Sequence, residues 1–196
     1  NGKIYAFEAS PSIFDDLSKN VSLNNASNII LKNIAISNAP GQCVIWTSPE
    51  GNLGHSTIMD NVAAMDGHKR ESLIECDTIL SLVPSDDLLQ ARFIKMDIEG
   101  AEKLALQGII GSLDSFSSNT EWIVEISPSF LAGGHLDAKW IFEAFIKAGY
   151  QAYLIENNYQ GMHETHRSYL YKLNTAPEGR LNDVLFTKNN VSKYIT

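Results

Sequence analysis

The first 36 residues alternate between strand-like and helix-like hydrophobic patterns, and this alternation is the strongest constraint on the fold. Residues 3–8 (KIYAFE) are mainly apolar and predict a strand. Ser10 then supplies a helix N-cap and Pro11 a proline at the first helical position, and apolar residues follow at helical spacing as far as Asn24. Residues 29–36 (IILKNIAI) predict a second strand. Strand, helix and strand in about 35 residues indicate a βαβ unit and therefore an α/β fold with a parallel sheet.

The rest of the chain continues this alternation. A polar stretch, residues 48–70, interrupts it, and a connection of that length is usually functional or mobile. A helix is predicted after residue 97, and another is capped by Asp137 and ended by Gly149. Strands are predicted at residues 42–47, 92–97, 121–126, 151–155 and 183–187, with a further apolar stretch at 73–82. We expect a single domain over residues 1–196.

Composition excludes several classes of protein. The 196 residues are 44% hydrophobic and 19% charged, which is ordinary for a globular protein. The net charge of −8, with no cluster of Lys and Arg, disfavours a nucleic-acid partner because a phosphate backbone needs cations. No apolar run approaches the roughly 18 residues of a membrane span, and the first residues lack signal-peptide features. We expect a soluble cytoplasmic protein, with Cys43 and Cys76 as reduced thiols in the core.

Acidic residues stand at or near the ends of three predicted strands: Glu8, Asp97 and Glu125. In open parallel sheets, ligands bind outside the carboxyl ends of the strands. Any one of these acids could simply end a strand or cap the following helix. Three on one predicted edge favour a site, and an acid at the position of Glu8 can accept both hydrogen bonds of a ribose diol.

Four segments resemble one family. They are GKIYAFEASPSIFDDLSKNVSLNN (2–25), NIAISNAPGQ (33–42), FIKMDIEGAEKLALQGI (93–109) and VEISP (124–128), and KMDIEGAE (95–102) is the most specific part. Together they resemble an FkbM-type methyltransferase. The resemblance implies S-adenosylmethionine as methyl donor and a hydroxyl group of a sugar or natural product as acceptor. It also implies the Rossmann-like class I methyltransferase fold, with a mostly parallel sheet, helices on both faces and an antiparallel last strand.

The resemblance has one departure. The first strand of the family and its glycine-rich loop, which cradle the methionine end of the cofactor, would precede Asn1. That strand would be central, so its loss would leave unpaired backbone groups on both neighbouring strands. We expect the sequence to be N-terminally truncated. The alternative is a remodelled sheet in which the two neighbouring strands pair directly.

The resemblance also assigns cofactor roles. Glu8 would hold the ribose hydroxyls of the cofactor, with Ala9, Ile34 and Ala35 lining the adenine. His55, in the long polar stretch, is a candidate for contacting the substrate. The other histidines are expected to be surface or capping residues and the tyrosines to pack on strands: His135, His163 and His166; Tyr150, Tyr153, Tyr169 and Tyr171.

Asp97, Glu99 and Glu125 are the candidates for chemistry. Any of them could be the general base that takes a proton from the acceptor hydroxyl, or could bind neighbouring hydroxyls of a sugar. Asp97 and Glu99 could instead hold a Mg²⁺ ion, and Glu99 could simply favour the start of the next helix. Two other functions stay open: a metal-dependent glycosyltransferase that uses Asp97 and Glu99, and a non-catalytic module that has lost cofactor binding.

Overall fold

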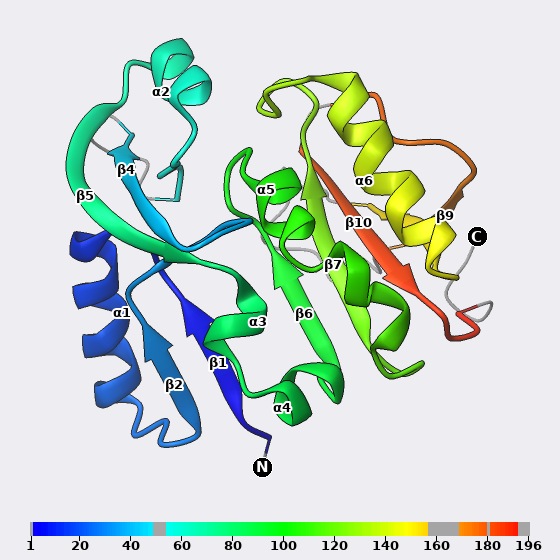
Figure 1. The fold of residues 1–196 in the computed structure, drawn as a ribbon, viewed down its shortest axis with the longest axis horizontal. Helices are drawn as coiled ribbons and strands as arrows, with labels where there is room; N and C mark the ends of the chain where they lie inside the picture. Colours follow the sequence, from blue (N-terminus) through cyan, green and yellow to red (C-terminus); the bar gives the residue numbers. More distant parts are fainter. Residues whose placement is uncertain (1, 49–53, 157–168, 180, 192–196) are drawn as a thin grey trace. The chain divides into compact units, whose positions relative to one another are not determined.

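The computed structural model describes residues 2–48, 54–156, 169–179 and 181–191 (Figure 1). Contacts divide the chain into two compact units. Unit 1 comprises Asn1–Pro84 with Leu104–Ile109, and unit 2 comprises Ser85–Lys103 with Ile110–Thr196. The single domain over residues 1–196 stays a prediction.

The first sheet of unit 1 is the predicted βαβ unit. Strand β1 (Ile4–Phe7) pairs in parallel with β2 (Ile29–Lys32), and helix α1 (Pro11–Leu23) connects them. Ser10 is the N-cap of α1, and its hydroxyl accepts the N–H of Ile13 at 3.3 Å. Pro11 occupies the first turn, as predicted, because its fixed φ suits a helix start and its missing N–H would have no helical partner there.

The predicted strand over residues 29–36 is wrong in its extent. It breaks into β2 and a short β3 (Ala35–Ile36), which belongs to a different sheet. The side chain of Asn33 donates to the carbonyl oxygens of Glu8 and Ala9, at 2.8 and 3.1 Å. An asparagine side chain that hydrogen-bonds backbone groups competes with regular strand pairing, which explains the break.

The second sheet of unit 1 has the order β3-β5-β4. Its two long strands, β4 (Gly41–Thr47) and β5 (Lys69–Asp77), are antiparallel, and β3 is parallel to β5. The core of this sheet is formed by buried apolar side chains with half-buried ones packed on them: Ala35, Ile45, Ile74 and Cys76; Ala9, Cys43 and Ile58. Both cysteines are free thiols, as predicted.

The polar stretch after β4 is not one long connection. It contains helix α2 (Asp60–Asp66), which ends at Gly67 in the left-handed region, and β5 already begins at Lys69. Trp46 and Thr57 exchange backbone hydrogen bonds of 2.8 and 2.9 Å, which fixes the segment before α2. Helix α3 (Ile79–Leu82) follows β5, in the predicted apolar stretch.

Unit 2 contains a five-stranded sheet with the order β6-β7-β10-β8-β9. Only β6 and β7 are parallel in this sheet, and the other three ladders are antiparallel. The described residues thus form an α/β protein with parallel and antiparallel ladders, and the mostly parallel sheet of the class I fold stays a prediction. The strands are β6 (Phe93–Met96), β7 (Glu121–Ile126), β8 (Gln151–Ile155), β9 (Leu170–Leu173) and β10 (Asn182–Thr187).

Helix α6 (His135–Lys147) corrects one prediction. Its N-cap is Gly134, and Asp137 lies inside the first turn instead of capping the helix. The carboxylate of Asp137 accepts the N–H of Gly133 at 2.8 Å and pairs with Lys103 at 2.5 Å, so it joins two segments of unit 2. The other helices that begin in this unit are short: α4 (Ser85–Leu89), α5 (Glu102–Gln107) and the 3₁₀ helix η1 (Ile110–Ser115).

Aromatic side chains form the core of unit 2. Phe145 stacks on Phe186 with ring centroids 4.1 Å apart and meets Trp122 edge to face at 5.4 Å. Tyr150 and Tyr153 are buried, as expected for tyrosines that pack on strands, whereas Tyr169 and Tyr171 are exposed. Within the described part of the chain, every helix is too short or too polar to cross a membrane.

Candidate active site

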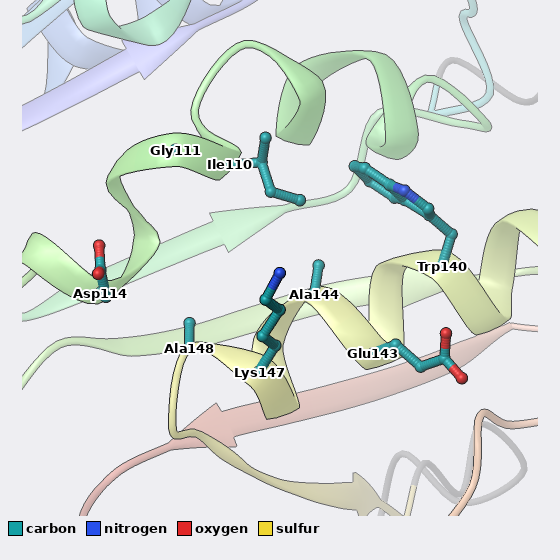
Figure 2. Close-up of a pocket in the computed structure, with 8 residues that line it drawn as sticks. All are labelled: Ile110, Gly111, Asp114, Trp140, Glu143, Ala144, Lys147 and Ala148. Atoms are coloured by element: carbon teal, nitrogen blue, oxygen red, sulfur yellow. The ribbon is translucent and has the colours of Figure 1, made fainter.

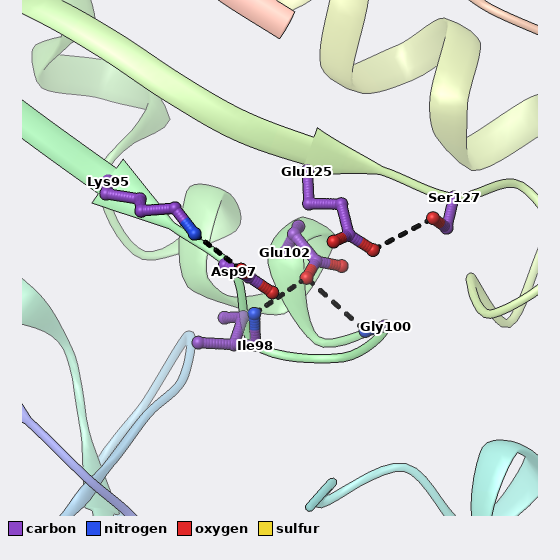
Figure 3. Close-up of polar contacts among 7 residues, drawn as sticks. All are labelled: Lys95, Asp97, Ile98, Gly100, Glu102, Glu125 and Ser127. Atoms are coloured by element: carbon purple, nitrogen blue, oxygen red, sulfur yellow. Dashed lines mark hydrogen bonds and ion pairs between the residues drawn. The ribbon is translucent and has the colours of Figure 1, made fainter. Parts of the chain in front are cut away.

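Asp97 stands at the end of β6, directly beside β7 (Figure 3). The parallel register pairs Met96 with Val124, so Asp97 and Glu125 each follow a paired residue on neighbouring strands. Asp97 forms an ion pair of 2.6 Å with Lys95, and 31% of its side chain is exposed. Burial alone would lower the pKa of Lys95, but the hydrogen bond and the negative charge of Asp97 raise it. Asp97 is thus an accessible carboxylate at the carboxyl end of a strand.

Glu99 lies in the turn after β6 and is only 7% exposed. Its φ of 53° and the φ of 97° at Gly100 put two consecutive residues in the left-handed region. Burial, and then the charges of Glu125 and Asp97, raise the pKa of Glu99 to about 8. Glu99 is therefore largely protonated at pH 7, and its pKa lies in the range where a side chain can both donate and accept a proton.

Glu125 faces the same group of charges from β7. Its carboxylate accepts the hydroxyl of Ser127 at 2.9 Å, and that hydroxyl accepts the N–H of Leu181 at 2.9 Å. Burial, and then the charge of Asp97, raise the pKa of Glu125. In the antiparallel register, Asp183 of β10 is opposite Glu125 and adds another acid. The acids predicted from the strand end and the following turn do gather in unit 2.

Sequence reasoning missed Glu102, the first residue of α5. Only 2% of Glu102 is exposed, and its Oε1 accepts the N–H groups of Ile98 at 3.0 Å and Gly100 at 3.3 Å (Figure 3). Burial raises the pKa of Glu102 to about 7, although the backbone hydrogen bonds act in the opposite direction. Glu102 is an acid in the first turn of a helix, where the helix dipole favours negative charge, and that was the signal available in the sequence.

The predicted cofactor residues lie in unit 1. Glu8 follows β1, and its Oε1 accepts the N–H of Ser10 at 2.8 Å. Burial raises the pKa of Glu8, and the nearby charge of Glu71 adds to this. Ala9 packs against the cluster that contains the buried Ala35, and Ile34 is half-buried directly before it. The hydrogen bonds from Asn33 to the backbone of Glu8 and Ala9 bring these segments together.

His55 also belongs to unit 1. Its carbonyl oxygen lies 2.6 Å from Nε2 of His68, which fixes the backbone there. His135 is the exposed first residue of α6, whereas His163 and His166 lie outside the described residues. The role of His55 toward a substrate stays a prediction.

The predicted acids do not line the groove found in unit 2. Among the residues that the structure describes, no three His, Cys, Asp or Glu side chains are arranged to hold a metal ion. A groove of about 390 Å³ runs between η1 and α6 (Figure 2). It is lined by residues of η1, of α6 and of the C-cap of α6: Ile110, Gly111 and Asp114; Trp140, Glu143, Ala144 and Lys147; Ala148.

Comparisons with known proteins identify the family. The family described as the methyltransferase FkbM domain matches residues 1–173. None of the curated proteins matches the chain. A crystal structure of the methyltransferase FkbM from Methylobacillus flagellatus KT is similar at 16% sequence identity and a TM-score of 0.49, covering 94% of this chain. The chain spans 36% of the length of that protein. Because the family match covers most of the sequence, the prediction from the four segments is confirmed, and the chain belongs to the FkbM methyltransferase family.

Proposed function

We propose that this protein transfers a methyl group from S-adenosylmethionine to a hydroxyl group of a sugar or natural product. The observation that carries the proposal is the gathering of Asp97, Glu99 and Glu125 beside Lys95, at the ends of two parallel strands, in a member of a methyltransferase family. S-adenosylmethionine supplies, when bound, an electrophilic methyl group.

The acids have distinct tasks in this proposal. Asp97 orients the acceptor hydroxyl and takes its proton, because it is the accessible carboxylate of the group. Glu99 and Glu125 hold neighbouring hydroxyls, and the raised pKa of Glu99 lets it donate a hydrogen bond as a neutral acid. Holding the acceptor in position is itself a large part of the rate enhancement in such a displacement.

Unit 1 has residues that fit the adenosine part of the cofactor. The carboxylate of Glu8 is fixed by the N–H of Ser10 at a strand end, where it can accept hydrogen bonds from a ribose diol. Ala9, Ile34 and Ala35 supply small or apolar surface next to it. We assign Glu8 to the ribose and the other three to the adenine.

We also propose the class I, Rossmann-like arrangement, with helices on both faces of the sheet and a further strand encoded upstream. Among the described residues, β1 has a ladder only with β2, and β6 only with β7. Each strand thus has an edge that could accept a partner. The coding sequence upstream of Asn1 tests this, since it should contain an apolar strand and a glycine-rich turn within about forty residues.

Asp97→Asn tests the chemical role. The change keeps the shape and most hydrogen bonding but removes charge and basicity, so turnover should fall about 10²–10⁴-fold. Cofactor affinity and melting temperature should change little. Turnover is measured with radiolabelled S-adenosylmethionine and a panel of hydroxylated sugars and natural-product alcohols. The control is Asp114→Asn, on the exposed face of η1. Near-native turnover in Asp97→Asn would move the role of base to Glu99 or Glu125.

Glu8→Ala tests the cofactor site without any acceptor. A hydrogen bond to a charged group contributes roughly 1.5–3 kcal/mol, so we expect at least about a tenfold weaker affinity for S-adenosylmethionine in calorimetry. Asp16→Ala, at an exposed position of α1, should bind like the unmodified protein. An unchanged dissociation constant in Glu8→Ala would remove this residue from the site. Binding of a UDP-sugar that depends on a metal, or of no ligand at all, would favour the glycosyltransferase or the non-catalytic module instead.

A further inference from the structure

We propose that Glu102 is the positioning residue of this site: its buried carboxylate holds the turn that carries Asp97 and Glu99 in the shape needed for catalysis. The inference rests on the function proposed above, because it concerns the presentation of the same acids. Glu102 itself is not assigned any contact with the acceptor or the cofactor.

The turn between β6 and α5 has a shape that needs external support. Glu99 and Gly100 are both left-handed, with φ of 53° and 97°. A residue with a side chain is unfavourable there, because its Cβ approaches the following carbonyl oxygen. Gly100 is free of that cost, but Glu99 is not. Such a conformation persists only where surrounding contacts enforce it.

Glu102 supplies those contacts from one atom. Its Oε1 accepts the N–H of Ile98, before the left-handed pair, and the N–H of Gly100, within it. Both bonds are made by a side chain that is 2% exposed, so water does not compete for them. The turn is therefore tied at two points to the first residue of α5.

Fixing these two N–H groups also fixes the acids between and beside them. Asp97 directly precedes Ile98, and Glu99 lies between the two tethered residues. A catalytic group must be held within a fraction of an ångström of its productive position, so a loosened turn would reduce turnover without removing any acid. Asp97 has its own tether, the ion pair with Lys95, but Lys95 is on β6 and does not restrain the turn.

The experiment compares Glu102→Gln with Glu102→Leu. Glutamine keeps an oxygen that can accept both N–H groups, whereas leucine fills similar space without an acceptor. Amide hydrogen exchange at Ile98 and Gly100, measured by NMR, should accelerate about tenfold or more in Glu102→Leu and change little in Glu102→Gln. Glu143→Leu, at an exposed position of α6, is the control for adding an apolar side chain.

Kinetics supply the second readout. In Glu102→Leu, kcat should fall about 10²-fold while the affinity for S-adenosylmethionine stays within a few-fold, and Glu102→Gln should restore most of kcat. Equal losses of kcat in both variants with unchanged exchange would give Glu102 a chemical role and overturn the proposal. Unchanged exchange at Ile98 and Gly100 in Glu102→Leu would overturn it as well.

If Glu102→Leu does not fold, Glu102→Asp replaces it, because the shorter carboxylate keeps the charge but does not reach both N–H groups; native exchange in that variant overturns the proposal. The exchange measurement uses neither cofactor nor acceptor. A failure of the proposed methyl transfer would appear as the absence of any labelled product from the unmodified protein across the acceptor panel, whereas a failure of the positioning role would appear in the exchange rates.

Discussion

Glu99 combines three unfavourable features at one residue: a left-handed backbone, a buried side chain and neighbouring carboxylates. Ionising a buried carboxyl group next to other carboxylates is costly, and the protein avoids the cost by keeping this group protonated near neutral pH. The same environment that makes Glu99 suitable for proton exchange therefore lowers the stability of the protein when the group ionises.

Glu99→Gln should reveal this cost as a dependence of stability on pH. The pKa of Glu99 rises from an ordinary value near 4.5 to about 8 in the folded protein. Between these values the folded state binds more protons than the unfolded state, so the free energy of unfolding falls as pH rises. Glutamine removes this contribution. Relative to the unmodified protein, the variant should gain at least about 2 °C in Tm between pH 5 and pH 8.5.

Thermal melts at the two pH values measure this gain, with Glu143→Gln on the exposed face of α6 as the control. The raised pKa of Glu102 acts in the same direction up to about pH 7, so the unmodified protein should keep part of its slope in Glu99→Gln. A difference in Tm that is the same at both pH values would contradict the assignment of a strongly raised pKa to Glu99.

At the scale of elements, a single glycine limits how α5 can end. A Cβ atom built on Gly108 would lie 2.8 Å from the carbonyl oxygen of Ser37 and 3.3 Å from Cα of Asn38. These are backbone atoms, so they cannot move aside as the end of a long side chain can. Gly108→Ala should therefore reduce the free energy of unfolding by about 1–3 kcal/mol through overpacking.

Gly111→Ala is a matched control in η1, where a Cβ atom would meet no atom within 4 Å. Chemical denaturation of both variants, with the slope against denaturant checked for a common value, gives the comparison. Equal free energies of unfolding in the two variants would show that the backbone at Ser37 and Asn38 moves freely to make room for the methyl group added at Gly108.

Elements whose signals are local were predictable from the sequence. The predicted bounds of β7 and β8 match the structure, and the N-cap at Ser10 is confirmed, because alternation of apolar residues and capping depend on adjacent residues. The break at Asn33 was not predictable, since it depends on hydrogen bonds to the distant carbonyl groups of Glu8 and Ala9. Asp137 looked like a cap, but its partners, Gly133 and Lys103, are set by the fold.

The site shows the same division. Asp97 and Glu125 could be placed together from the sequence, because the ends of neighbouring parallel strands share an edge. Glu102 was missed, because its importance comes from complete burial and from two backbone partners that only the folded turn provides. Sequence identifies the acids proposed to react, and the fold shows which acid accepts the backbone N–H groups of the turn that carries them.

At the scale of the whole molecule, the aromatic core of unit 2 should dominate stability. Phe186 is fully buried, stacks on Phe145 and meets Phe142 edge to face at 6.4 Å. Phe186→Ala should cost about 3–5 kcal/mol in the free energy of unfolding, from lost burial and the cavity left behind. Phe93→Ala, on a strand of the same sheet but 53% exposed, should cost much less in the same denaturation experiment. Similar losses in the free energy of unfolding of the two variants would show that neighbouring side chains fill the cavity left by Phe186.

The position of β10 has a consequence for the time at which the protein can fold during synthesis. This strand ends at Thr187, yet it lies between β7 and β8 and pairs with both. A ribosome that has already released β8, which ends at Ile155, has still to add more than thirty residues before that gap can be filled. At about 5–20 residues per second this takes on the order of seconds, during which two strand edges stay open. During that interval the open edges of β7 and β8 can pair with strands of other chains, so the nascent chain has to be protected from such pairing.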